Sequence, residues 1–231
     1  MALPETVIPL PAPTLLPVRG GGAFPVRRIY CVGRNFADHA AEMGASVDRG
    51  NPVFFHKPAD AIVAGGGDVP YPSGTQDLHH EVELVVALGQ DAKGVVAVDG
   101  AMALVFGYGV GLDLTRRDLQ ARAKAKGLPW DTAKGFDHSA PASELVPAAE
   151  AGDLDQRLLW LDVNGQRRQQ ATLASMVFSV AEVINELSKL YALKAGDLVF
   201  MGTPAGVAAL QHGDTFHAGI EGLVALEGRI T

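Results

Sequence analysis

His80-Glu81-Val82-Glu83-Leu84-Val85-Val86-Ala87-Leu88-Gly89 is the stretch that decides the fold and points to a site. It predicts a β-strand, because Val and Leu are dense and a glycine closes the run. Side chains two residues apart share one face of a strand, so Glu81 and Glu83 point the same way. Two neighbouring acids at the start of an apolar strand repel each other unless a cation compensates them. The spacing leaves two interpretations open, a pair of metal ligands or a solvated strand end.

A third acid favours the metal. Asp113 ends a second apolar, glycine-rich run that starts at Phe106. No Cys or His lies at metal-ligand spacing from these three carboxylates, and the strand alternation places His80 on the face opposite Glu81. An all-oxygen set suits Mg²⁺ or Mn²⁺, with Ca²⁺ as a further candidate, rather than Zn²⁺.

Composition limits the class of protein. The chain has 231 residues, 48% of them apolar, which is ample for a packed core. A formal net charge of −7 without any basic run argues against a nucleic-acid partner. No run approaches the roughly 20 apolar residues that span a bilayer, so no membrane partner is expected. The single cysteine, Cys31, lies in an apolar run, which indicates a structural thiol and a cytoplasmic protein.

The sequence divides into a short arm and a long remainder. Residues 1–22 carry five prolines and lack the basic start of a signal peptide, which predicts an extended arm or edge strand. Residues 23–231 have ample apolar content for one large domain or two small ones. Their pattern predicts several short strands and a few helices.

Two helices carry candidate functional residues. Asn35–Gly44 has a cap-capable Asn and a closing Gly, and His39 and Glu42 share a face three residues apart. A carboxylate against an imidazole suits a general base, although a surface pair has the same spacing. Thr115–Gly127 has a Thr cap and helix formers throughout.

Polar residues near Asp113 include several cations that could bind an anion. Arg116, Arg117 and Gln120 follow Asp113, and each arginine could equally be solvated. Lys57 ends a predicted strand over 52–55, where a lysine usually reaches solvent. Lys134 lies in a predicted loop over 128–141, either exposed or selected for chemistry.

The last third of the chain predicts a hairpin, a helix and a strand. Leu158–Val163 and Gln166–Leu173 flank a tight Asn164-Gly165 turn, and Ser179–Tyr191 carries an apolar stripe. Gly196–Met201 predicts a strand that runs into Gly202–Val207. The hydroxyl of Thr203 and the backbone amides of this turn could hold a carboxylate.

Taken in order, six blocks resemble the fumarylacetoacetate hydrolase family, and more closely its small acylpyruvate hydrolases. The blocks are GRNFADHAAEM, FFHKPADAIV, HHEVELVVALG, GYGVGLDLTRRDLQ, KGLPWDTAKGFDHSAP and GDLVFMGTPAGV. The match runs from about Phe24 to the C-terminus. It implies that residues 23–231 form one catalytic domain with an α+β, strand-rich fold, a mixed β-sandwich roll with a few covering helices. It also implies a homodimer that acts on a small 2,4-dioxo acid.

The resemblance also implies a role for each motif residue. Glu81, Glu83 and Asp113 would bind Mg²⁺ or Mn²⁺, and His39 with Glu42 would activate water. Lys134 would stabilise an oxyanion. The pair Arg116-Arg117 resembles the fumarylpyruvate hydrolases of gentisate breakdown. The substrate-binding residues implied are Lys57, Arg116, Arg117, Gln120 and Thr203.

The reaction expected from these groups is hydrolysis of the C3–C4 bond of an acylpyruvate, most simply fumarylpyruvate to fumarate and pyruvate. Decarboxylation of oxaloacetate is an alternative that uses the same enolate stabilisation, and a broader acylpyruvase is another. A glycosidase with paired carboxylates fits less well, because only 6% of the residues are aromatic. A non-catalytic module that binds a metal and a 2-oxo acid is the alternative outside the enzymes.

Overall fold

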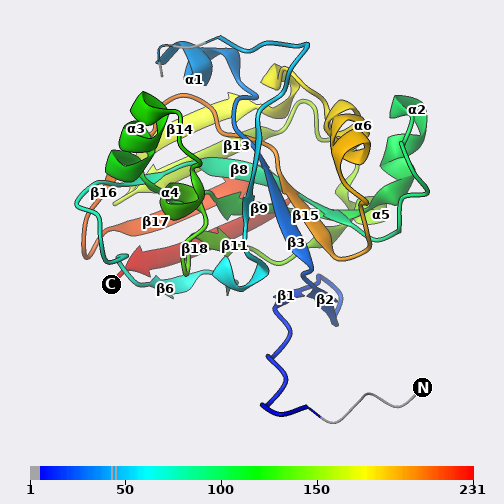
Figure 1. Cartoon of the computed structure of the whole chain (residues 1–231), viewed down its shortest axis with the longest axis horizontal. Helices are drawn as coiled ribbons and strands as arrows, with labels where there is room; N and C mark the ends of the chain where they lie inside the picture. The colour runs from blue at the N-terminus through cyan, green and yellow to red at the C-terminus, as the bar shows by residue number, and fades with distance from the viewer. Residues whose placement is uncertain (1–5, 43, 45) are drawn as a thin grey trace.

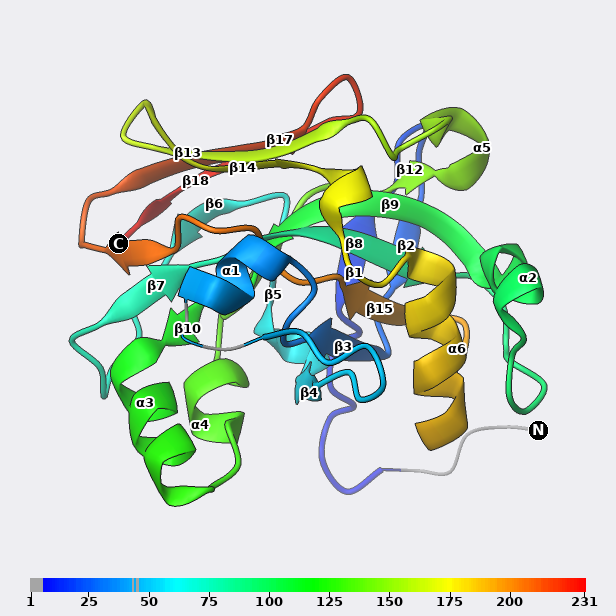
Figure 2. The ribbon, with the colours of Figure 1, turned by 90° about the horizontal axis from the view of Figure 1, so that it is seen from above.

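The computed structural model describes residues 6–42, 44 and 46–231. Two sheets pack face to face, with the helices along their edges and ends (Figures 1 and 2). This arrangement confirms the predicted α+β, strand-rich sandwich roll.

The larger sheet has eight strands and contains Val82–Leu88, the apolar part of the stretch His80–Gly89. Its order is β4-β3-β15-β8-β9-β11-β5, with β12 paired to β9. Most neighbours are antiparallel, but β15 pairs with β3, and β11 with β5, in parallel. The strands are β3 (Arg28–Val32), β4 (Phe54–Lys57), β5 (Ile62–Ala64), β8 (Val82–Leu88), β9 (Val105–Leu112), β11 (Ala140–Ala142), β12 (Val146–Pro147) and β15 (Asp197–Phe200).

The second large sheet has five strands in the order β14-β13-β17-β18-β6. The predicted hairpin is confirmed, since Asn164 and Gly165 take φ values of 51° and 73° between β13 and β14. The strands are β6 (Gly67–Val69), β13 (Leu158–Val163), β14 (Gln166–Thr172), β17 (Thr215–Ile220) and β18 (Val224–Ile230).

Two small sheets complete the strands. One has the order β10-β7-β16, and the other pairs β1 with β2. The hairpin of β1 and β2 spans the division predicted at residue 22, and the described part of the arm before it extends away from the body (Figure 1). The strands are β1 (Leu15–Pro17), β2 (Ala23–Pro25), β7 (Leu78–His80), β10 (Thr115–Arg116) and β16 (Ala208–Leu210).

Strand β8 separates two apolar cores, as its alternation requires. Leu84, Val86 and Leu88 face the core between the two large sheets. Val85 and Ala87 face a second core, which also contains Cys31. Burial raises the pKa of the Cys31 thiol, in agreement with a structural role. Glu81 and Glu83 therefore lie at the end of the second core.

The helices are short, and two begin differently from the prediction. They are α1 (Ala37–Glu42), α2 (Val98–Ala101), α3 (Arg117–Lys126), α4 (Asp131–Lys134), α5 (Ala148–Ala151) and α6 (Val180–Leu190), with 3₁₀ turns at Ala59–Ala61, Met102–Leu104 and Leu173–Ser175. Helix α6 starts with a capping box from Ser179 to Glu182 and confirms the predicted amphipathic helix.

The expected caps at Asn35 and Thr115 are wrong. The buried amide of Asn35 donates to the carbonyls of Phe178 and Met201 instead, while Thr115 lies in β10. Residue 43, part of the predicted first helix, lies outside the described residues. The predicted loop over 128–141 contains α4, which places Lys134 at a helix end.

Candidate metal centre and active-site cleft

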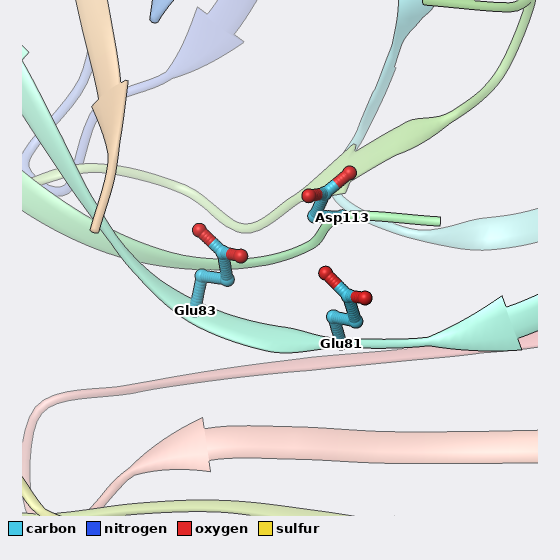
Figure 3. A group of neighbouring side chains, drawn as sticks. All are labelled: Glu81, Glu83 and Asp113. Carbon is cyan, nitrogen blue, oxygen red and sulfur yellow. The ribbon is translucent and has the colours of Figure 1, made fainter. Parts of the chain in front are cut away.

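Three buried carboxylates meet where β8 begins and β9 ends. One oxygen each from Glu81, Glu83 and Asp113 lies within 4.8 Å of the other two. Figure 3 shows Glu81 and Glu83 on one side and Asp113 facing them from the end of β9. The backbone fixes this meeting, because the Asp113 amide donates to the Glu81 carbonyl at 2.8 Å.

Three cations surround the carboxylates. Lys134 Nζ donates to Glu81 Oε2 at 2.7 Å and to Asp113 Oδ2 at 2.6 Å. Lys57 Nζ lies 2.9 Å from Asp113 Oδ1 and donates to the carbonyls of Leu114 and Lys134. Arg117 pairs with Glu81 Oε1 at 2.5 Å. These contacts hold the carboxylates from the sides.

The surrounding charges affect the three acids unequally. Burial disfavours ionisation of Glu81, but Lys134 and Arg117 outweigh burial and hold its pKa well below the usual value. Burial, with the charges of Asp113 and Glu81, raises the pKa of Glu83 well above its usual value. A dication among the three oxygens would remove the repulsion that raises it.

The donor set fits a hard divalent cation. All three ligand candidates are carboxylates, which Mg²⁺ and Mn²⁺ prefer. In addition, Asp113 Oδ1 is buried and accepts no well-aligned hydrogen bond among the described residues, although Lys57 Nζ lies 2.9 Å away. The residues present therefore suit the predicted cation.

His39 and Glu42 form a pair beside this group. His39 Nδ1 lies 3.4 Å from Glu42 Oε2, and the imidazole is almost fully buried. The Gly206 amide donates to both carboxylate oxygens of Glu42 at 3.2 Å, which fixes the carboxylate. Burial lowers the pKa of His39, so the ring is neutral near pH 7. Its second nitrogen, Nε2, is then free to accept a proton.

The turn from Gly202 to Gly206 touches both groups. The Gly202 amide donates to Glu83 Oε2 at 2.7 Å, four residues before the amide that holds Glu42. Both glycines have left-handed backbones, with φ of 88° and 97°. The predicted carboxylate-binding turn therefore holds two carboxylates of the protein itself.

A narrow cleft opens above the carboxylates. Five of the predicted site residues line it: His39, Glu81, Arg117, Gln120 and Lys134. Arg117 donates to Gln120 Oε1 at 2.6 Å, so the two act as one unit on α3.

Other predicted residues lie elsewhere. Lys57 is buried behind Asp113, and the Thr203 hydroxyl accepts a hydrogen bond from Gln169 at 2.8 Å. Arg116 stacks on Phe136, with its guanidinium carbon 4.4 Å from the ring centroid. None of the three lines the cleft within the part of the chain that the structure describes.

Sequence reasoning missed two cations of the cleft, Arg34 and Lys124. The spacing of Arg117, Gln120 and Lys124 could have found the second, because positions i, i+3 and i+7 share a helix face. Arg34 gives no such signal, because it lies between β3 and α1, outside any periodic element.

A strand-rich sandwich that holds three buried carboxylates under a cationic cleft defines a protein with an all-oxygen site for a divalent cation. The chain belongs to the fumarylacetoacetate hydrolase family: the family model described as fumarylacetoacetate (FAA) hydrolase C-terminal matches residues 28–231.

Two relatives in this family are named for the tautomerisation of oxaloacetate. Oxaloacetate tautomerase FAHD1, mitochondrial, of Rattus norvegicus is 44% identical over 204 residues, 88% of this chain and 91% of its own. Oxaloacetate tautomerase YcgM of Escherichia coli is 44% identical over 200 residues, 86% of this chain and 90% of its own.

A solved structure connects the family to a metal. Fumarylpyruvate hydrolase from Pseudomonas aeruginosa in complex with Mn²⁺ and pyruvate is 43% identical, with a TM-score of 0.93. The match covers 98% of this chain and 99% of that chain. The comparison and the buried carboxylates together support the predicted cofactor, Mn²⁺ or Mg²⁺.

Among the helices of residues 6–42, 44 and 46–231, none has the length and hydropathy needed to traverse a bilayer.

Proposed function

We propose that this protein hydrolyses the C3–C4 bond of an acylpyruvate, with fumarylpyruvate as the substrate, giving fumarate and pyruvate as in gentisate-type aromatic breakdown. The observation that carries the proposal is the meeting of three buried carboxylates at Lys134, with Glu81, Lys134 and His39 of the His39–Glu42 pair lining one cleft. The likeness to a fumarylpyruvate hydrolase in complex with Mn²⁺ and pyruvate, which covers nearly the whole of both chains, supports it.

In this proposal Glu81, Glu83 and Asp113 hold the cation. The bound cation would supply Lewis-acid chemistry, polarising the 2-oxo acid and stabilising the pyruvate enolate that departs. The side chains of Lys57 and Lys134 keep the carboxylates in place, because each contacts Asp113 at less than 3 Å.

His39 would act as the general base. Glu42 orients the ring through Nδ1, so that Nε2 removes a proton from water and the hydroxide adds to the C4 carbonyl. Lys134 would donate to the oxyanion at C4. The C3–C4 bond then breaks, its electron pair leaves with pyruvate, and the proton is returned to C3.

Tautomerisation of oxaloacetate is a second candidate, favoured by the two relatives named for it. This reaction moves a proton between C3 and the enol oxygen and consumes no water. His39 could transfer that proton, so the same cleft serves either reaction. Decarboxylation of oxaloacetate is a third candidate, distinguished by its release of CO₂.

One set of assays separates the candidates. Purified protein with Mn²⁺ or EDTA is given fumarylpyruvate, acetylpyruvate or oxaloacetate, and pyruvate, CO₂ and the enol absorbance are followed. We expect Mn²⁺-dependent pyruvate release from fumarylpyruvate without CO₂. A protein that only interconverts the forms of oxaloacetate would refute the hydrolase proposal, and one that binds without turnover would be a non-catalytic module.

The His39–Glu42 pair has its own test. His39→Ala should keep metal binding but lose about 10² to 10⁴ in kcat, the usual contribution of a general base. Glu42→Gln, which keeps an acceptor for the Gly206 amide, should lose less. Full hydrolytic activity in His39→Ala would contradict the assignment.

The remaining expectations are part of the same proposal. We propose a cytoplasmic homodimer, with residues 23–231 as the catalytic domain and the proline-rich segment as an arm. Light scattering at several protein concentrations tests the dimer, and removal of residues 1–14 tests whether the domain retains activity without the arm.

A further inference from the structure

Two further cations line the cleft, Lys124, which is exposed, and Arg34, which is half-buried, and we call this more accessible part of the cleft its mouth. Within residues 6–42, 44 and 46–231, neither side chain forms an ion pair with a carboxylate. Nine of the 19 Lys and Arg residues have no ion pair with a carboxylate within the described residues, so what distinguishes Arg34 and Lys124 is that both line the same cleft. Two unpaired cations beside one cleft point to an anionic ligand.

The inner cations of the cleft differ from the outer ones. We call Glu81, Glu83 and Asp113 the metal group. Lys134 and Arg117 each contact a carboxylate of this group, so their charges are already compensated. Arg34 and Lys124 have no such partner, and a bound dication would add further positive charge below them. The outer end of the cleft is therefore the part that still lacks a negative charge.

Local structure holds both outer residues in place. Lys124 lies on the face of α3 that carries Arg117 and Gln120, with its Nζ 5.1 Å from the centroid of the Trp130 ring. Gly127, at φ 63°, ends the helix directly after this turn. Arg34 precedes Asn35, whose side chain is bonded to Phe178 and Met201.

Burial, with the nearby Arg117, lowers the pKa of Lys124, and the charges of Lys134 and Arg34 act in the same direction. An anion bound at the mouth would reverse this electrostatic cost. Arg116, which the sequence suggested as the residue that binds an anion, instead stacks on the Phe136 ring and donates to the Thr132 carbonyl at 3.3 Å.

We propose that Arg34 and Lys124 bind the distal carboxylate of a dicarboxylic substrate whose 2-oxo acid end lies at the metal group. This inference rests on the proposed function for the position of the 2-oxo acid. It selects a long diacid such as fumarylpyruvate over a monoacid such as acetylpyruvate. It also disfavours oxaloacetate, whose second carboxylate is only one carbon beyond the 2-oxo group.

The test uses two ligands that the protein cannot cleave. 2-Oxoheptanedioate and 2-oxoheptanoate have equal length and the same 2-oxo acid, lack the 4-oxo group, and differ in the distal carboxylate. Their affinities for the Mn²⁺-loaded protein are measured by calorimetry. We expect wild type to favour the diacid about tenfold, equivalent to about 1.4 kcal/mol, and Lys124→Met to lose most of that preference.

Three further variants complete the design. Lys126→Met removes an equal charge from the same helix turn away from the cleft lining and should keep the preference. Lys124→Arg should restore it, and Arg34→Met should reduce it. An unchanged preference in Lys124→Met, or an equal loss in Lys126→Met, would overturn the proposal.

The binding test is independent of turnover. If the wild type prefers the diacid but does not hydrolyse fumarylpyruvate, the proposed reaction fails and the carboxylate site stands. If it hydrolyses fumarylpyruvate and acetylpyruvate equally and shows no preference between the two probes, the reaction stands and the carboxylate site fails.

Discussion

Replacing Glu83 with Gln should separate two effects on the free energy of unfolding. One is the destabilising repulsion among the three carboxylates, and the other is the stabilisation by bound metal. Glu83 is only 1% exposed, and burial, together with repulsion by Asp113 and Glu81, raises its pKa. Glutamine keeps the shape and an acceptor for the Gly202 amide, which lies 2.7 Å from Glu83 Oε2. Without metal, the variant should therefore melt at or above the wild-type temperature.

With metal bound, wild type should melt at a higher temperature than Glu83→Gln. A cation at 100 times its Kd stabilises the folded state by about 2.7 kcal/mol. For a chain of this length each kcal/mol shifts Tm by about 2–4 °C, so Mn²⁺ should raise the wild-type Tm by about 5–11 °C. Glu83→Gln should lose most of that shift, since one of its three carboxylates is gone.

The assay is thermal unfolding of both proteins in EDTA and over a series of Mn²⁺ concentrations. Glu227→Gln, an exposed acid on β18, is the control and should retain the full shift. A Glu83→Gln protein that gained as much from Mn²⁺ as wild type would refute the proposed ligand set. Instability of the variant in EDTA would refute the repulsion argument.

Two more outcomes are expected. Burial lowers the pKa of His39 from its usual value of 6.5, and the neutral ring is the active form. The value of kcat/KM should therefore stay level from pH 8 to about 6.5 and fall only at lower pH. A pH profile in which the fall begins above pH 7 would contradict this. Gly202→Ala should lower the free energy of unfolding by about 1–3 kcal/mol or more, because φ is 88° and the new Cβ would lie 2.8 Å from Asn35 Cβ. Gly213→Ala, with the same φ of 88° and nothing within 4 Å, should cost less in the same denaturant titration.

Sequence patterns were sufficient where a residue's position follows from local periodicity. The alternation of Glu81 and Glu83, and the end of the next strand at Asp113, predicted the carboxylate group because a sheet brings successive strand ends together. The Asn164-Gly165 hairpin and helix α6 followed from equally local rules.

Patterns failed where tertiary contacts compete with a local preference. Asn35 is a good cap by type, yet its amide joins two distant segments at Phe178 and Met201. Arg116 ends β10 and Arg117 begins α3, so the backbone changes conformation between them, and only Arg117 reaches Glu81 while Arg116 stacks on Phe136. Sequence adjacency alone could not distinguish them.

The turn from Gly202 to Gly206 links the three-carboxylate group to the His39–Glu42 pair. One amide of this turn holds Glu83 and another holds Glu42, although the two acids lie on elements far apart in the sequence. A Cβ at Gly206 would lie 2.1 Å from the Arg168 carbonyl, so β14 packs directly against the turn and fixes it. Since one rigid turn positions both acids, a shift of its backbone would displace the metal ligand and the orienting carboxylate together. Their relative position is therefore a property of the turn and not of either acid alone.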